Sequence, residues 1–406
     1  MKEPLWTRNF LAIIAANAFL FSGFHFLLPT ITLYAASLGA NGMQIGLVGG
    51  IFGYAAIFIR LFTDTGVKFF GKKTCLYLGL GCSIAATLAY YFFDNIDAVI
   101  AARVLHGFGF GLSTTFAAAI AVDIIPASRR GEGIGYFGLG STIMMALAPA
   151  VGLLLLSDYG PGALFTTSAL FSAFAVAAIF ACRLGKFTQG RAKVMAKRSQ
   201  ASLRDRICES GTGLPAILTI LFGAAYGSVN TYIAMLANEA NISGAGIFFI
   251  VATIFVFISR PFGGRLFDKK GPFYVILPGA VLYLIALGII SSASSLTALL
   301  VASFFYGLGA GCLLPALLTW IMNMVRPERR SSASATFYNM LDIGTSTGLI
   351  ALGVLAGSIG YRQMYLCVAG IMVFFIALFL AHHFLSQKNA QAKADEELEL
   401  SSEPEA

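Results

Sequence analysis

The chain has few charged residues and few of the polar clusters that build enzyme sites. Only 11% of its 406 residues are Asp, Glu, Lys or Arg, and only four are histidine. Soluble domains carry roughly 25% charged residues, so this composition excludes a soluble globular protein. The six cysteines form no CxxC pair, so we expect no metal site and no cofactor. Because no Walker loop, HExxH motif or nucleophile–base set occurs, we do not expect an enzyme.

Most of the chain consists of apolar residues. They make up 58% of the chain, and the mean hydropathy is +0.81. Twelve membrane helices of roughly 20 residues each would account for this excess. Apolar runs of spanning length lie near residues 10–33, 44–62, 75–93, 98–122, 133–156, 162–184, 214–237, 244–262, 273–291, 296–324, 333–357 and 364–385. The sequence therefore predicts an all-α membrane protein with twelve transmembrane helices.

Positive charge is confined to alternate connections between these runs. The connections that carry it hold Lys68, Lys72, Lys73, Arg129, Arg130, Arg265, Lys269, Lys270, Arg326, Arg329 and Arg330. Among the remaining connections only Arg362 breaks the pattern. Since basic loops stay on the cytoplasmic side, both termini are predicted to be cytoplasmic, in a cell membrane. The net charge of +8 then reflects these loops and the lipid bilayer, and we expect no nucleic-acid partner.

The two halves of the chain resemble each other at a shift of 200 residues. Arg60 matches Arg260, and the glycines 107, 109 and 111 match 307, 309 and 311. An even number of spans per copy makes the two copies parallel and places a binding site between them, near the middle of the membrane. We therefore predict two six-helix bundles related by pseudo-twofold symmetry, at residues 1–184 and 213–385. A basic cytoplasmic linker (185–212) would join them, and an acidic tail (386–406) is expected to be disordered.

A family resemblance rests on the stretch Arg260-Pro-Phe-Gly-Gly-Arg-Leu-Phe-Asp-Lys-Lys-Gly271. This stretch resembles the RPxxGrlxDrxG signature loop of the major facilitator superfamily. Its glycines suit a tight cytoplasmic turn. The resemblance implies gating roles for Arg260, Gly264, Arg265 and Asp268. The first-half copy departs from the pattern, and only Asp64 remains there as a candidate gating acid.

Two further stretches indicate a particular branch of this superfamily. Arg103-Val-Leu-His-Gly-Phe-Gly-Phe-Gly111 is similar to the RxxxGxG motif of twelve-span drug:proton antiporters, which implies a proton-pathway role for Arg103. Gly138, Gly140, Pro149 and Gly152 resemble the antiporter motif GxxxGPxxGG, with a helix kinked at Pro149. The stretch 126–136 is also similar to staphylopine-type metallophore exporters.

Ionisable groups within the hydrocarbon are candidate sites because burying them is costly. Asp342 lies about 15 Å into its span, near the middle of the membrane. A desolvated carboxyl group there can take up and release a proton, and Arg103 with His106 would assist. Asp342 could instead bond permanently to Asn339, and Asp123 is expected to pair with Arg129 or Arg130. The possible cavity-lining residues are His25, Tyr226, Asn230 and Asn339.

Two transport functions remain open. The first is proton-coupled efflux of small amphiphilic organic compounds, drug-like or metallophore-like, by a monomer that works by alternating access. The second is proton-coupled import of an anionic or zwitterionic metabolite, because Arg103, His106 and His25 outnumber the acids in the first-half spans.

Overall fold

The computed structural model describes residues 4–182, 209–326 and 329–402. All regular structure within these ranges is helical. Apart from one 3-10 turn at Ala127–Arg129, the elements are α1 (Arg8–Leu27), α2 (Thr30–Ser37), α3 (Gly42–Arg60), α4 (Thr63–Phe92), α5 (Ile96–Ile124), α6 (Arg130–Ala181), α9 (Gly213–Glu239), α10 (Ile247–Lys270), α11 (Phe273–Ser292), α12 (Leu296–Asn323) and α13 (Arg330–Ser402).

Helices α6 and α13 each contain two membrane spans. Their backbones leave the helical region at Gly160 and Gly360, with φ of 80° and 83°. Contacts with α1 show the reversal in α6. Asn17 bonds to the carbonyl of Phe137, whereas Ser168 bonds to Gly23 and Cys182 to Asn9, so the second leg runs back along α1. Ten described helices are long and apolar enough to span a membrane, and these two reversals make twelve spans.

The predicted duplication is confirmed by geometry that recurs at the same shift of 200. Gly71 and Gly271 both have positive φ, 75° and 85°, and both precede a spanning helix. Gly107 and Gly307 abut the carbonyls of Phe52 and Ala252, which are also 200 residues apart. Only a glycine permits these approaches, because a Cβ at either position would collide with the carbonyl.

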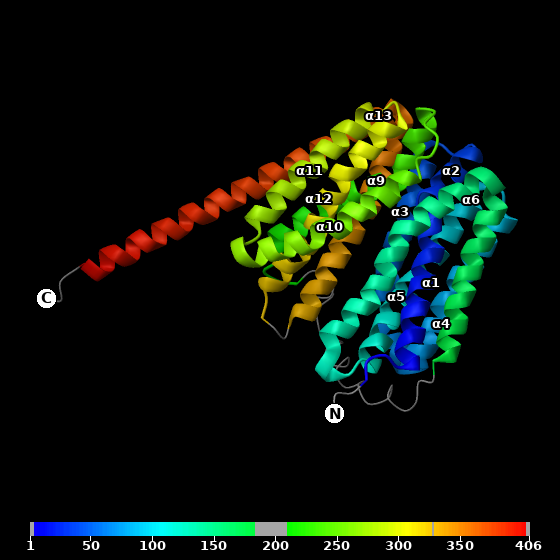
Figure 1. Cartoon of the computed structure of the whole chain (residues 1–406), viewed down its shortest axis with the longest axis horizontal. Coiled ribbons are helices and arrows are strands. Elements are labelled where there is room, and N and C mark those ends of the chain that lie inside the picture. Colours follow the sequence, from blue (N-terminus) through cyan, green and yellow to red (C-terminus); the bar gives the residue numbers. More distant parts are fainter. Residues whose placement is uncertain (1–3, 183–208, 327–328, 403–406) are drawn as a thin grey trace.

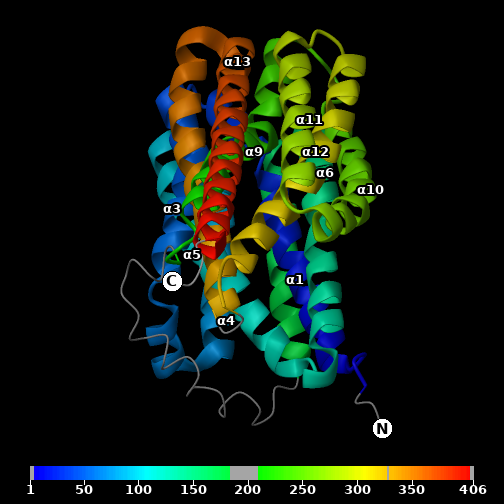
Figure 2. The same ribbon diagram turned by 90° about the vertical axis from the view of Figure 1, so that its left-hand side faces the viewer.

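The two bundles meet at one end and part at the other. Figure 1 shows that they converge near α2 and diverge toward the end that carries the turn between α12 and α13, and Figure 2 shows the second bundle in front of the first. We call the diverging end the basic end, because it holds the lysines and arginines of the charged connections, and we call the converging end the closed end. α3 and the first leg of α13 (330–359) form the main contact between the bundles.

The structure bears on three predicted segments outside the spans: the linker, the C-terminal tail and the signature stretch. Residues 183–208 of the predicted linker region lie outside the described residues. The backbone of α13 continues as a helix to Ser402, where a disordered tail was expected, because Ala, Glu, Lys, Gln and Leu are strong helix formers. The signature stretch is not a loop with several turn glycines. α10 continues as a helix through Pro261 to Lys270, and the chain turns only at Gly271.

Candidate functional site

A row of glycines forms the seam between the bundles at the closed end. Gly42, Gly46 and Gly50 follow one another at intervals of four on α3, so they share one face of the helix. A Cβ at Gly50 would lie 2.5 Å from the carbonyl oxygen of Ser346, and one at Gly46 would lie 2.8 Å from that of Ile350. Such distances are below van der Waals contact, so the two backbones touch along this seam.

An ion pair joins the two bundles where the seam stops on its way to the basic end. Arg60 Nη1 donates to Asp342 Oδ2 at 2.5 Å. The side chains retain 24% and 33% of their exposure, so solvent reaches both. Arg60 lies about 27 Å along α3 from Gly42, at 1.5 Å per residue. Asp342 was identified from the sequence, but Arg60 was not recognised as its partner. Arg60 could have been singled out in the sequence because it is the repeat counterpart of Arg260.

Tyrosines and one asparagine form the wall of the second bundle beside this pair. Asn230 donates to the backbone carbonyl of Tyr226 and to the hydroxyl of Tyr306, both at 2.8 Å. The rings of Tyr226 and Tyr306 are nearly parallel, with centroids 6.4 Å apart. The predicted cavity residues Tyr226 and Asn230 are therefore brought together.

Arg260 stands next to this wall. It lies in α10 and is half-buried, within electrostatic range of Tyr226 and of Tyr338, which also senses the charge of Asp342. Asn339 is half-buried one turn before Asp342 on α13. Arg60 and Arg260, which are related by the repeat, and Asp342 thus all lie among the described groups between the bundles or beside Tyr338.

His25, His106 and Arg103 form a separate buried group inside the first bundle. Arg103 is fully buried, its Nε donates to the carbonyl of Val48 at 2.7 Å, and its guanidinium lies over the ring of Phe52. His106 Nδ1 is 3.4 Å from the hydroxyl of Tyr90, and His25 Nδ1 is 2.9 Å from the carbonyl of Phe21. No hydrogen bond or ion pair in the described ranges joins this group to Asp342. The predicted proton-coupling set is thus divided between the two bundles.

The remaining signature residues lie at the basic end of α10. Arg265 and Asp268 are exposed, and nothing lies within 4 Å of a Cβ added at Gly264. Gly263 instead packs against Cys312 of α12, whose sulfur would lie 3.2 Å from a Cβ added at Gly263. Asp64 is the second residue of α4, and its side chain lies outside the described part of the structure.

Pro149 and Gly152 of the antiporter motif both lie within the first bundle. Pro149 lies inside α6, and Gly152 abuts the carbonyl of Phe26 on α1. The contact with the other bundle falls on their neighbour Ala150, whose backbone would lie 3.3 Å from a Cβ added at Gly246. The motif was expected to let the halves close tightly, and in the structure its glycine serves packing within one half.

The ion-pair partner of Asp123 differs from the prediction. It pairs with Lys72 at 2.6 Å, with both side chains 8% exposed, and not with Arg129 or Arg130. Arg129 pairs with Glu132, its neighbour one helical turn along. A lysine from α4 reaches Asp123 because α4 packs along α5, a contact that the local sequence does not reveal.

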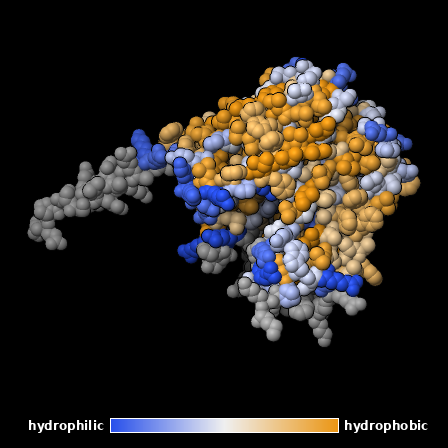
Figure 3. All heavy atoms as spheres, in the orientation of Figure 1, coloured by the Kyte–Doolittle hydropathy of each residue, from blue (hydrophilic) through white to orange (hydrophobic). Residues whose placement is uncertain are grey.

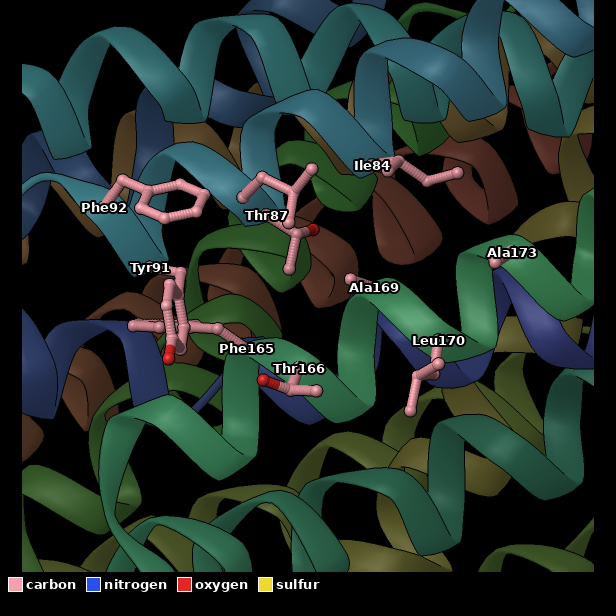
Figure 4. Close-up of a pocket in the computed structure, with 10 residues that line it drawn as sticks. Ile84, Thr87, Tyr91, Phe92, Phe165, Thr166, Ala169, Leu170 and Ala173 are labelled. Atoms are coloured by element: carbon pink, nitrogen blue, oxygen red, sulfur yellow. The ribbon is translucent and has the colours of Figure 1, made fainter.

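The space-filling view places the hollow between the two bundles, where Figure 3 shows a dark recess below the apolar surface of the second bundle. A different cavity, of about 330 Å³, lies between α4 and the second leg of α6. Figure 4 shows Thr87 and Thr166 as its only hydroxyl groups besides Tyr91, among apolar side chains such as Leu170. With no charged group in its lining, it is suited to lipid chains and not to an ionic substrate.

Comparisons with known proteins agree with this architecture. The chain is 27% identical over 381 residues to the multidrug resistance protein MdtG of Enterobacter lignolyticus, which covers 91% of this chain and 90% of that protein. It is 24% identical over 358 residues to an uncharacterized MFS-type transporter from Methanocaldococcus jannaschii, covering 84% of this chain and 90% of the other.

Among solved structures, the nucleoside transporter NupG superposes with a TM-score of 0.72 at 15% identity, over 92% of this chain and 99% of that one. A peptide transporter, POT, in complex with sulfate gives a TM-score of 0.71 at 14% identity, over 94% of this chain and 96% of that one. The family model of the Major Facilitator Superfamily matches residues 10–297 and 215–404. The chain is therefore a multi-pass membrane transporter that belongs to the major facilitator superfamily.

Proposed function

We propose that this transporter exports small amphiphilic organic compounds from the cytoplasm in exchange for protons. The observation that carries the proposal is the Arg60–Asp342 ion pair, which joins the two bundles where the glycine seam ends and the hollow begins. The relatives named for multidrug resistance support export.

The ion pair can link proton movement to the contact between the bundles. The pair requires an ionised Asp342, so protonation removes the charge that Arg60 contacts and loosens the bundles. The orientation described here, parted at the basic end, therefore corresponds to the unprotonated carboxylate. If the basic end is cytoplasmic, as the positive-inside rule predicts, a proton taken up outside is released inside as the pair forms again.

Parting of the glycine seam would complete the cycle. The seam must open for a substrate to leave at the closed end, while the basic ends approach each other. This is the rocking of one bundle against the other that the duplicated architecture permits. The protein needs no cofactor for this cycle, because the proton gradient supplies the free energy.

A second candidate is proton-coupled import of an anionic or zwitterionic metabolite. It is favoured by the excess of positive charge at the centre, where Arg60 and Arg260 stand near a single acid, Asp342. An anion bound there would be helped by protonation of Asp342, and such positive coupling is typical of cotransport rather than exchange.

Flux into proteoliposomes separates the two candidates. The purified protein is reconstituted, and ethidium and naphthalene-2-sulfonate, both permanently charged and fluorescent, serve as probes. An exchanger accumulates a probe when the lumen is acidic, and a cotransporter does so when the outside is acidic, whichever way the protein is inserted. We expect accumulation into acidic lumens, and none in protein-free liposomes. Accumulation only with an acidic exterior would reject export, and no driven flux of either probe would reject proton coupling.

A further inference from the structure

The pseudo-twofold symmetry makes a second contact between the bundles the counterpart of the glycine seam. Gly46 of α3 packs against Ile350 of α13. Adding 200 to the first number and subtracting 200 from the second gives Gly246 of α10 and Ala150 of α6, which are also in contact. The pair α10–α6 is thus the repeat-related copy of the pair α3–α13.

The same operation applied to the Arg60–Asp342 ion pair gives Arg260 and residue 142. Arg260 retains the positive charge, but residue 142 is threonine. The hydroxyl of Thr142 donates to the carbonyl of Gly138, within its own helix, at 2.9 Å. One of the two symmetry-related ion pairs therefore lacks its acid.

The surroundings of Arg260 do not replace that acid. Within the described ranges no carboxylate lies within 4.0 Å of it, and its Nε is buried without a hydrogen-bond partner. It lies about 20 Å along α10 from Ile247, inside the predicted apolar run 244–262 and two residues from its basic end. A guanidinium at such a depth is costly unless a counter-charge or water reaches it.

We propose that Arg260 binds the anionic group of the transported substrate, which supplies the charge that Thr142 lacks. The guanidinium offers paired donors that match a carboxylate, sulfonate or phosphate group. Tyr226 and Tyr338 lie within electrostatic range of Arg260, and aromatic side chains near the guanidinium favour an apolar, ring-bearing body. The substrate class is thus an amphiphilic organic anion. The inference rests on the proposed transport function but not on its direction.

Binding by the purified full-length protein tests this without a proton gradient. Naphthalene-2-sulfonate is compared with uncharged 2-naphthalenemethanol and with cationic (2-naphthylmethyl)trimethylammonium. We expect the sulfonate to bind at least 10-fold more tightly than either analogue. Arg260→Gln should abolish this preference, whereas Lys269→Gln, which changes an exposed cation of the same helix, should keep it.

Substitutions at Thr142 give the sharper comparison. Thr142→Asp restores the missing acid, so it should raise the melting temperature above that of Thr142→Asn and weaken sulfonate binding at least 10-fold. Thr142→Asn has nearly the same size without the charge, and it should leave binding within about threefold. A double variant, Arg260→Gln with Thr142→Asp, should lose the gain in melting temperature.

Three results would overturn the proposal. They are no preference for the sulfonate in the wild-type protein, an undiminished preference in Arg260→Gln, or equal effects of Asp and Asn at residue 142. The assay is repeated in nanodiscs of phosphatidylcholine with and without phosphatidylglycerol. Loss of sulfonate binding in the anionic nanodiscs would assign Arg260 to a lipid headgroup and would also overturn the proposal. Failure of gradient-driven flux with anion binding intact would instead contradict only the proposed function.

Discussion

Replacing Asp342 by asparagine is expected to reduce proton-driven flux at least 10-fold while substrate binding persists. Asparagine keeps the size of the side chain but cannot exchange a proton or pair with Arg60 as an anion. The measurement is gradient-driven probe accumulation in proteoliposomes, alongside probe exchange without a gradient. Asp158→Asn, at an exposed acid on the other side of the molecule, serves as the control and should leave both fluxes unchanged.

The stability of the same variants tests the ion pair itself. Asp342→Asn leaves Arg60 without its counter-charge, which should cost about 1–3 kcal/mol, less than for a fully buried pair because both side chains are partly exposed. Adding Arg60→Gln should recover part of that loss, since the pair acts as a unit in a double-mutant cycle. Unchanged driven flux in Asp342→Asn, or strictly additive losses in the double variant, would contradict a coupling role for the pair.

Replacing Gly46 by leucine is expected to hold the closed end apart. A Cβ at this residue would already lie 2.8 Å from the carbonyl oxygen of Ile350, and leucine adds three more carbon atoms. The orientation described here depends on that contact, so the protein should shift toward the opposite orientation and its exchange rate should fall at least 10-fold.

Accessibility labelling measures the shift. A cysteine placed at Thr231, which packs near the seam at Gly49, should become reactive to a membrane-impermeant maleimide in the Gly46→Leu background. Gly288→Leu is the matched control, because nothing lies within 4 Å of a Cβ there. Equal effects of the two leucines on transport would mean that Gly46 matters through general packing and not through the seam.

Much of the fold follows from local patterns that the structure confirms. Hydropathy gives the spans, and the glycines at 107 and 307 reveal the duplication because each permits the same close approach of two helices. The breaks at Gly160 and Gly360 fall in the short gaps predicted between the apolar runs, at 157–161 and 358–363. The length of α10 was missed because the glycines of the signature stretch suggested a turn, whereas the helix continues through Gly263 and Gly264 to Lys270.

The candidate site was only partly predictable. Asp342 was found because an acid in an apolar run is conspicuous. Its partner Arg60 lies 282 residues away, and the pairing depends on which faces of α3 and α13 meet. The same difficulty hid Lys72 as the partner of Asp123. Periodicity places a residue on a helix face, but it does not say which helix that face contacts.

The central claim is that the two bundles rock about a site between them, and paired distances test it most directly. Spin labels at exposed residues 43 and 358 report on the closed end, and labels at residues 68 and 269 report on the basic end, in a cysteine-free background. On changing pH or adding naphthalene-2-sulfonate, we predict that one distance lengthens as the other shortens. Distances that change in the same direction, or that stay fixed under conditions of active transport, would contradict the account.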